Sequence, residues 1–253
     1  MSSDGFSGAL SAVVRPESSK RSCRIGFLIS DGAGPCLAVH EAIAAGQLPG
    51  CTLALVICNI TGAPGTEAAR AQGLRAITLE GRGHEQREHE EAIDTLLRRM
   101  SVDLLCVSGY LRVLSRDFIR RWPGRILTLH NSLLPAFPGA MPERQALEFG
   151  AQVTGCTISI LDETADALGG GPILVQRAIP IAPDETVTSL QKRLAPEEDD
   201  AYVEAIRRMC SGDYKMEGRR LVFLVQESAS LSDDFETTNE GSEAVSDKAE
   251  TPA

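Results

Sequence analysis

Short apolar runs alternate with amphipathic stretches along the middle of the chain. The apolar runs predict buried strands over residues 24–30, 52–58, 75–79, 102–108 and 125–130. The stretches between them predict helices over residues 36–46, 66–72, 85–100 and 115–122. Continuous apolar strands separated by helices are typical of a parallel sheet that is covered on both faces. We therefore expect an α/β fold with three layers, a helix–sheet–helix sandwich.

The pattern changes after residue 150. Two further strand-like runs, residues 155–160 and 173–179, follow each other without a helix between them. They predict an antiparallel extension of the mainly parallel sheet. Residues 187–209 then read as a long closing helix.

The two ends of the chain differ in composition from the middle. Residues 227–253 contain eight Asp or Glu and one Lys among many Ser and Thr, so this acidic tail is expected to be disordered. Residues 1–22 lack the basic start and the long apolar core of a secretory signal, and they predict a flexible leader. The single folded domain is expected at residues 23–226.

Charge and cysteine usage exclude several classes of protein. The net charge of −10 without a basic stripe argues against a nucleic-acid partner. The chain lacks the run of about 20 apolar residues that a membrane span needs. The seven cysteines are odd in number and show no metal-ligand spacing, which indicates reduced thiols in a cytoplasmic protein and no metal site.

Three segments fall where the strands of an open α/β sheet end, which is where such sheets bind ligands. The glycines of residues 30–34, Ser-Asp-Gly-Ala-Gly, fit either a phosphate-binding loop or a plain tight turn. His130 ends an apolar strand, and imidazole suits proton transfer near neutrality, so a catalytic role is favoured over a structural one. The other three histidines, His40, His84 and His89, are expected to be solvated.

The third segment is an acidic stretch that runs into three glycines. Asp162, Glu163 and Asp166 lie in it, and Gly169–Gly171 follow. It is either a solvated loop before a hairpin or a mobile loop that brings a carboxylate to a ligand.

Four segments together resemble the folate-dependent formyltransferases, and within them those that act on glycinamide ribonucleotide. These segments are residues 106–115 (CVSGYLRVLS), 130–139 (HNSLLPAFPG), 145–148 (QALE) and 153–157 (VTGCT). The resemblance covers residues 24–215, and it implies the formyltransferase fold. It also implies transfer of a formyl group from 10-formyltetrahydrofolate, as co-substrate, to the amine of glycinamide ribonucleotide in de novo purine synthesis. The implied partners are these two small molecules.

The resemblance also implies roles for individual residues. The catalytic positions are His130, Asp166 and Thr128, the last standing where the family has Asn. The remaining positions bind the substrate phosphate (Gly32, Ala33, Gly34 and Pro35), the substrate amine (Glu198) and the folate (Arg112, Val113, Leu114 and Arg87).

The chain departs from the family pattern at several of these sites. Besides Thr128, residues 167–169 form an insertion after Asp166, and Asn131 replaces the Pro that normally follows the histidine. Glu143 and Ser159 each stand where the family has a histidine. Two alternatives therefore remain open: an impaired homologue that acts as a binding or regulatory module, and an enzyme that uses another formyl acceptor or water.

Overall fold

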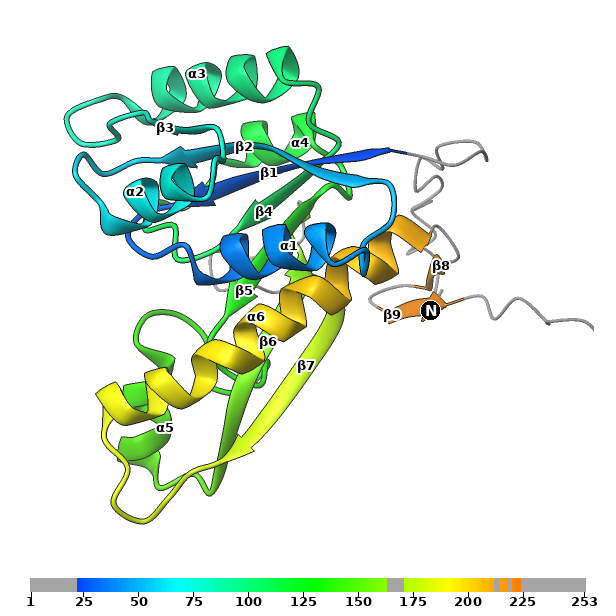
Figure 1. Ribbon diagram of the computed structural model, residues 1–253. Helices are drawn as coiled ribbons and strands as arrows, with labels where there is room; N and C mark the ends of the chain where they lie inside the picture. Colours follow the sequence, from blue (N-terminus) through cyan, green and yellow to red (C-terminus); the bar gives the residue numbers. More distant parts are fainter. Residues whose placement is uncertain (1–21, 163–170, 212–213, 218–219, 224–253) are drawn as a thin grey trace, which may run out of the picture.

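The computed structural model describes residues 22–162, 171–211, 214–217 and 220–223. Its seven-stranded sheet is built from β1 (Cys23–Ile29), β2 (Cys51–Cys58), β3 (Ala76–Thr78), β4 (Leu104–Val107), β5 (Ile126–His130), β6 (Val153–Ile160) and β7 (Ile173–Pro180). The strand order is β3-β2-β1-β4-β5-β6-β7 (Figure 1). The first five strands pair in parallel, whereas β6 pairs antiparallel with both β5 and β7. The predicted parallel sheet with an antiparallel extension is thus confirmed.

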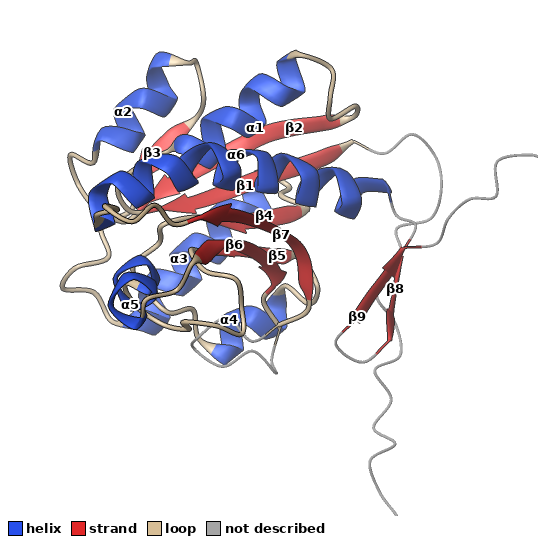
Figure 2. Ribbon diagram, turned by 90° about the horizontal axis from the view of Figure 1, so that it is seen from below, coloured by secondary structure: helices blue, strands red, loops and turns tan. Residues whose placement is uncertain are grey.

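Helices cover both faces of this sheet. They are α1 (Gly34–Ala44), α2 (Pro64–Ala71), α3 (Gln86–Arg99), α4 (Arg116–Arg121), α5 (Pro142–Phe149) and α6 (Val187–Ser211). Helices α1, α2 and α6 pack on one face, and α3 and α4 pack on the other (Figures 1 and 2). The expected three layers are therefore present.

Each face of the sheet has its own apolar core, because alternate residues of a strand point to opposite faces. Phe27 of β1 and Tyr202 of α6 lie in the core on the α1 side, with their ring centroids 5.7 Å apart. Leu28 and the fully buried Trp122 belong to the core on the α3 side. The middle strands are buried on both faces, which explains their continuous apolar sequences.

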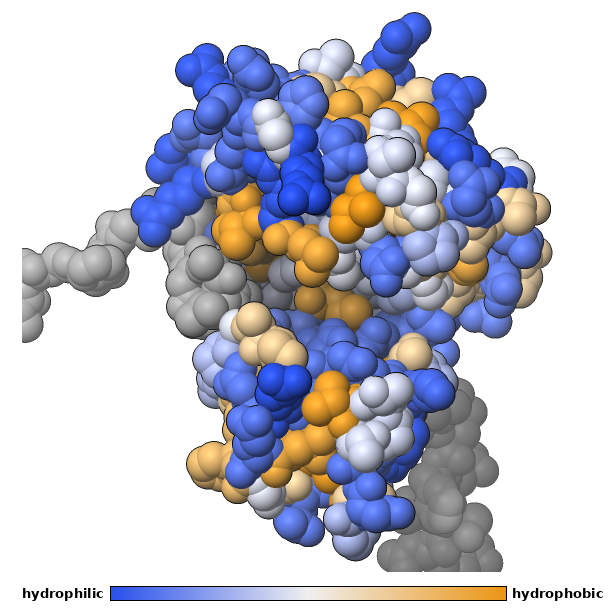
Figure 3. All heavy atoms as spheres, turned by 90° about the vertical axis from the view of Figure 1, so that its left-hand side faces the viewer, coloured by the Kyte–Doolittle hydropathy of each residue, from blue (hydrophilic) through white to orange (hydrophobic). Residues whose placement is uncertain are grey.

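The register of the parallel strands aligns their carboxyl ends at one edge. Ile29 pairs with Cys58 across β1 and β2, while Leu28 and Thr128 each pair with Val107 of β4. The loops after β1, β2, β4 and β5 therefore emerge together. The molecule is hollowed across its middle on the side at which β1 ends (Figure 3).

Several features were not predicted from the sequence. No helix was predicted at α5, where the sequence analysis noted only a short family match. A two-stranded sheet of β8 (Tyr214–Glu217) and β9 (Arg220–Phe223) follows α6. Among the described helices, none has the length and apolar character needed to cross a membrane. The expected leader and acidic tail lie outside the described residues.

The spacing of the cysteines in the sequence suggested that they lie apart in the fold, but three of them lie together. The sulfurs of Cys23, Cys51 and Cys210 come within 4.8 Å of one another. The parallel pairing of β1 with β2 brings Cys23 beside Cys51, and α6 returns along the sheet so that its last turn adds Cys210. Sequence spacing cannot reveal a cluster that the tertiary fold assembles.

Candidate functional site

The end of β5 carries the predicted catalytic pair Thr128 and His130. These residues are two apart in a strand, so their side chains share one face of the sheet. Thr128 pairs with Ser159 of β6, and His130 pairs with Thr157. The four polar side chains are therefore grouped on the face opposite α6.

The ring of His130 is anchored by the loop that follows β5. Its Nε2 lies 3.1 Å from the carbonyl oxygen of Phe137. A carbonyl only accepts, so Nε2 must donate and carry the proton. The neutral ring then has Nδ1 as its remaining acceptor, and the protonated ring has an N–H at that position to donate.

Polar contacts from β6 and β7 fix the shape of this loop. The hydroxyl of Thr157 donates to the carbonyl of Ser132 at 2.6 Å and accepts from the N–H of Leu134 at 3.1 Å. Gln176 donates to the carbonyl of Leu134 at 2.9 Å. Because the loop is held at these points, the Phe137 carbonyl can orient the His130 ring.

Two positions at which the sequence departs from the family pattern contact each other. The side-chain amide of Asn131 donates to Oε1 of Glu143 at 3.0 Å, and Glu143 is only 3% exposed. Gln191 of α6 donates to the same oxygen at 3.4 Å. The changes to Asn and Glu thus form a matched buried pair that joins the His130 loop to α5 and α6.

Glu198 of α6, the predicted amine-binding residue, lies in a negative environment. Burial raises the pKa of Glu198 to about 7, and Glu143 and then Asp199 add to the increase. A carboxyl group with this pKa changes charge near neutral pH. It can therefore bind a cationic amine and accept its proton.

Replacing Glu198 by Gln is expected to stabilise the fold at alkaline pH. The pKa of Glu198 is higher in the folded state than its ordinary 4.5, so the parent loses stability as the pH rises from about 4.5 to about 7. The Gln side chain does not ionise, so the variant does not lose this stability. We expect thermal unfolding of Glu198→Gln to show a Tm about 3–6 °C above the parent at pH 8 and an equal Tm at pH 4. A gain of the same size at pH 4 would show that the effect is not electrostatic.

Glu197→Gln is the matched control for this prediction. Glu197 neighbours Glu198 on α6, but its carboxylate pairs with Arg177 at 3.4 Å. Its replacement removes a favourable contact and should not raise the Tm at pH 8.

The predicted phosphate loop lies between β1 and α1. The first hydrogen bond within α1 runs from the N–H of Leu37 to the carbonyl of Ala33 at 2.9 Å. The N–H groups of Ala33, Gly34 and Cys36 precede that bond, and Pro35 has none. A helix N-terminus of this kind binds anions through such donors.

Asp199 of α6 faces this loop, and sequence reasoning missed it. A Cβ atom on Gly34 would lie 3.1 Å from Asp199 Oδ1, and this oxygen is buried without a hydrogen-bond partner among the described residues. Burial raises the pKa of Asp199 to about 6, and Asp200 and Glu41 add to the increase. Glycine at position 34 thus leaves room for a carboxyl group beside the anion-binding end of α1.

A polar contact joins the loops after three neighbouring strands. The hydroxyl of Ser30, after β1, donates to Asn59 Oδ1 after β2 at 2.6 Å. The Ser30 hydroxyl oxygen itself accepts from the N–H of Leu111, after β4, at 2.9 Å. Ser30 is fully buried, so this contact fixes the predicted phosphate loop relative to the predicted folate segment.

Arg112 lines a cavity of about 700 Å³ beside the loop after β2. Its guanidinium donates to the carbonyl of Gly81. Of the other predicted folate residues, Val113 is exposed and Leu114 is buried in the core. Val113 can therefore contact a ligand with its side chain, whereas Leu114 has only its backbone to offer.

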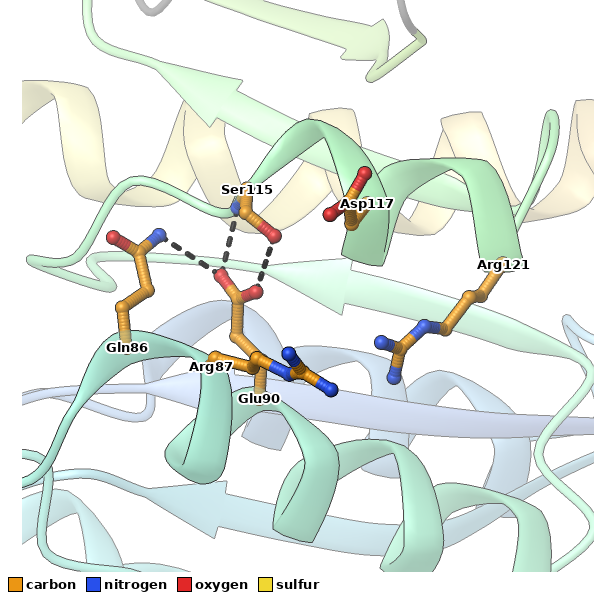
Figure 4. A pocket seen from close by; sticks show the side chains of 6 residues that line it. All are labelled: Gln86, Arg87, Glu90, Ser115, Asp117 and Arg121. Atoms are coloured by element: carbon orange, nitrogen blue, oxygen red, sulfur yellow. Dashed lines mark hydrogen bonds between the residues drawn. The ribbon is translucent and has the colours of Figure 1, made fainter.

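Arg87 is not brought to this cavity. It lines a different one, of about 600 Å³, and pairs with Glu91 at 2.9 Å. That second cavity lies between α3 and α4 and is lined by Gln86, Arg87, Glu90, Ser115, Asp117 and Arg121 (Figure 4).

Glu90 of α3 binds the end of the predicted folate segment through hydrogen bonds. The buried carboxylate accepts from the N–H of Ser115 at 2.7 Å, from the Ser115 hydroxyl, and from Gln86 at 3.0 Å (Figure 4). Gln86 also donates to the carbonyl of Val113 at 2.8 Å. The segment from Val113 to Ser115 is thereby tied to α3.

His89 is buried, so the expectation that it is solvated is wrong. Its Nε2 lies 3.0 Å from the hydroxyl of Tyr110. Burial lowers the pKa of His89, and the charges of Arg112 and His84 add to the decrease. The sequence of α3 is mostly charged, which suggested a solvated histidine, but His89 falls on the inner face of the helix.

The predicted site residues thus form groups at one edge of the sheet. Thr128 and His130 share a face, residues 32–35 form the loop at α1, and Arg112 and Val113 lie after β4. Asp166 and the insertion at 167–169 lie outside the described residues, as does Glu163.

The sequence and the structure of this chain are similar to those of known proteins. The family model described as Formyl transferase matches residues 23–206. The trifunctional purine biosynthetic protein adenosine-3 of Homo sapiens is 32% identical over 203 residues, which cover 78% of this chain and 19% of that protein. The chain spans only 14–19% of the length of the trifunctional relatives it matches.

Shorter relatives match over most of their length. The phosphoribosylglycinamide formyltransferase of Haemophilus influenzae is 30% identical over 194 residues, 76% of this chain and 90% of that protein. The crystal structure of glycinamide ribonucleotide transformylase 1 from Symbiobacterium toebii matches with a TM-score of 0.75 and 37% identity. That match covers 80% of this chain and 94% of the other.

Proposed function

This chain belongs to the formyl transferase family, and on that premise we propose that it is a phosphoribosylglycinamide formyltransferase. It transfers the formyl group of 10-formyltetrahydrofolate to the amine of glycinamide ribonucleotide. The reaction is a step of de novo purine synthesis, and we place it in the cytoplasm. The chain needs these two small molecules and neither nucleic acid nor a membrane.

One observation carries the proposal. Strands β1, β4 and β5 are neighbours in the sheet, and the residues proposed to bind the phosphate, the Arg112 segment and His130 follow their carboxyl ends. A nucleotide phosphate at α1 and a folate beside Arg112 would meet near the end of β5. This arrangement suits direct transfer between two bound substrates.

His130 moves the proton in the proposed reaction. The amine attacks the formyl carbon, and a tetrahedral intermediate with a negative oxygen forms. His130 accepts the proton of the attacking nitrogen at Nδ1 and returns it to N10 of the folate as the C–N10 bond breaks. The products are the formylated amide and tetrahydrofolate. The Phe137 carbonyl keeps Nε2 protonated throughout, so Nδ1 stays in the working position.

Thr128 supplies a hydroxyl donor to the oxyanion, and Asp166 is proposed to stabilise the positive charge of the protonated His130. Glu198 binds the substrate amine and removes its extra proton, because an ammonium cannot attack. The phosphate is held by the backbone of Gly32, Ala33 and Gly34 together with the Pro35 turn. Arg112, Val113 and the backbone of Leu114 hold the folate, whereas Arg87 lines the other cavity and is given no part in this site.

Restoring an amide at position 128 is expected to speed the reaction. An Asn side chain reaches farther than Thr, and Ser159 opposite it has a buried hydroxyl without a hydrogen-bond partner among the described residues. We expect Thr128→Asn to raise kcat about tenfold, since one oxyanion donor can supply that much. Thr128→Val, which removes the donor and keeps the shape, should lower kcat by about 100-fold. A slower Asn variant would exclude an oxyanion role for this position.

Adding one methyl group at Gly65 is expected to weaken nucleotide binding. The N–H of Gly65 donates to the carbonyl of Asp31 at 2.8 Å, and a Cβ atom there would overlap that oxygen. The phosphate loop must therefore shift in Gly65→Ala. We expect at least a tenfold rise in the Kd for glycinamide ribonucleotide, about 1.4 kcal/mol, measured by calorimetry.

The exposed Glu67→Ala on the same helix is the control and should leave this Kd unchanged. Equal affinities of Gly65→Ala and parent would separate phosphate binding from this loop.

The test of the proposed function is an assay of tetrahydrofolate release with both substrates present. Release is expected to require glycinamide ribonucleotide and to be saturable in each substrate. Release that is independent of the ribonucleotide would point to water as the acceptor and overturn the proposal.

A further inference from the structure

The cysteine cluster lies at the edge of the sheet opposite the catalytic edge. Cys23 and Cys51 are the first residues of β1 and β2, and they are register partners. Cys210 belongs to the last turn of α6. We propose that Cys23, Cys51 and Cys210 form a three-thiolate binding site for a thiophilic metal ion, with Zn²⁺ as its ion.

The spacing of the sulfurs suits a tetrahedral metal. A Zn–S bond is about 2.3 Å long, so sulfurs that share a tetrahedral zinc lie about 3.8 Å apart. The sulfurs of Cys51 and Cys210 are 3.5 Å apart, and all three lie within 4.8 Å of one another. Shifts of less than about 1 Å bring the three to ligating distance, and a water molecule can take the fourth position.

The backbone holds two of the thiols in advance of binding. The N–H of Cys23 donates to the carbonyl of Gly50 at 2.8 Å, and the N–H of Cys51 donates to the carbonyl of Leu48 at 3.2 Å. Cys51 is buried and Cys23 is half-buried, whereas Cys210 is exposed. The site thus has a rigid base on the sheet and one side open to an incoming ion.

The chemistry of the surroundings favours a soft cation. Among the described residues, the titratable groups that interact with these sulfurs are the sulfurs themselves, Cys106 and Tyr214. Thiolates without a carboxylate or a histidine among these partners select zinc-like ions over Mg²⁺ or Ca²⁺.

A disulfide would engage only two of the three sulfurs in this cluster. The bond between two sulfurs is about 2.05 Å long, far shorter than the 3.5 Å observed, and it would leave the third thiol unpaired. A metal ion engages all three sulfurs at once. It would also join the start of the sheet to the end of α6.

The bound ion would serve structure and not the reaction. Cys210 is 11 residues beyond Asp199, which is about 17 Å along the helix. Because α6 carries both Glu198 and Cys210, zinc would fix the end of the helix whose earlier turns face the substrates. Its expected effect is therefore on stability and not on the chemical step.

The test uses the full chain, reduced and freed of metal under argon, and then titrated with Zn²⁺ or Co²⁺. We expect one ion per chain, a Kd below about 100 nM, and a rise in Tm of about 5–10 °C at a hundredfold excess over Kd. Co²⁺ should give the intense visible bands of a tetrahedral site and thiolate charge-transfer absorption. A Co²⁺ spectrum without that charge transfer would overturn the proposal whatever the variants do.

Variants locate the ion. Cys210→Ser changes an exposed residue and should weaken binding by more than about 100-fold. Cys58→Ala, at the opposite end of β2, about 23 Å away, should bind Zn²⁺ like the parent. Equal affinity of Cys210→Ser and parent would contradict the site. So would a Cys51–Cys210 disulfide in the isolated chain, combined with no metal binding after reduction.

Discussion

His130→Ala is expected to lower kcat by at least about 1,000-fold, or about 4 kcal/mol of transition-state stabilisation. The reason is that His130 is the proton carrier of the proposed reaction, and its Nδ1 is the only ring nitrogen left free by the Phe137 contact. The Kd for each substrate should change less than threefold, because binding rests on α1 and on the Arg112 segment. Single-turnover kinetics and calorimetry measure the two effects separately.

His40→Ala is the control for this prediction. His40 lies on α1, is half-buried and is none of the proposed site residues, so its loss should leave kcat unchanged. If His130→Ala turned over at the parent rate, another group would have to carry the proton. If instead it lost both affinities, His130 would be a structural residue.

Glu90→Ala is expected to have the largest effect on stability. Its loss leaves the N–H and the hydroxyl of Ser115 without their carboxylate acceptor, at a position where Glu90 is only 5% exposed. Removing one partner of such a buried network costs about 3–5 kcal/mol, so the Tm should fall by about 6–15 °C. The Val113–Ser115 segment is released as well, and the Kd for the folate should rise at least tenfold.

Glu91→Ala tests whether position and not charge is responsible. Glu91 is the next residue of α3, but it is exposed and pairs with the exposed Arg87. A surface pair of this kind contributes little to stability, because solvent screens its charges. Equal losses of Tm in Glu90→Ala and Glu91→Ala would contradict the proposed support of the folate segment.

Most of the fold was predictable because each buried strand is a continuous apolar run that ends at a polar or glycine-containing turn. Helix α5 escaped notice although its signals are present. Pro142 opens its first turn and Gly150 follows its last one, a common pairing at helix ends. The helix has only eight residues and follows a Pro-rich loop, so its apolar period was too short to stand out.

Candidate site residues were predictable only where they lie at or directly after the end of a predicted strand. His130 and the loop at α1 could be found in this way. The contact of Asn131 with Glu143 and the position of Asp199 beside Gly34 join separate segments, and no local pattern encodes them. The thiols of Cys51 and Cys210 are 159 residues apart in the sequence and 3.5 Å apart in space.

Transfer of an isotopic label tests the central claim most directly. The full chain is mixed with glycinamide ribonucleotide and 10-formyltetrahydrofolate whose formyl carbon is ¹³C, and the fate of that carbon is followed by NMR. The proposed function predicts that the label appears in the formamide of the ribonucleotide, with one tetrahydrofolate formed per label moved. Labelled formate, or a label that stays on the folate while both substrates bind, would contradict it.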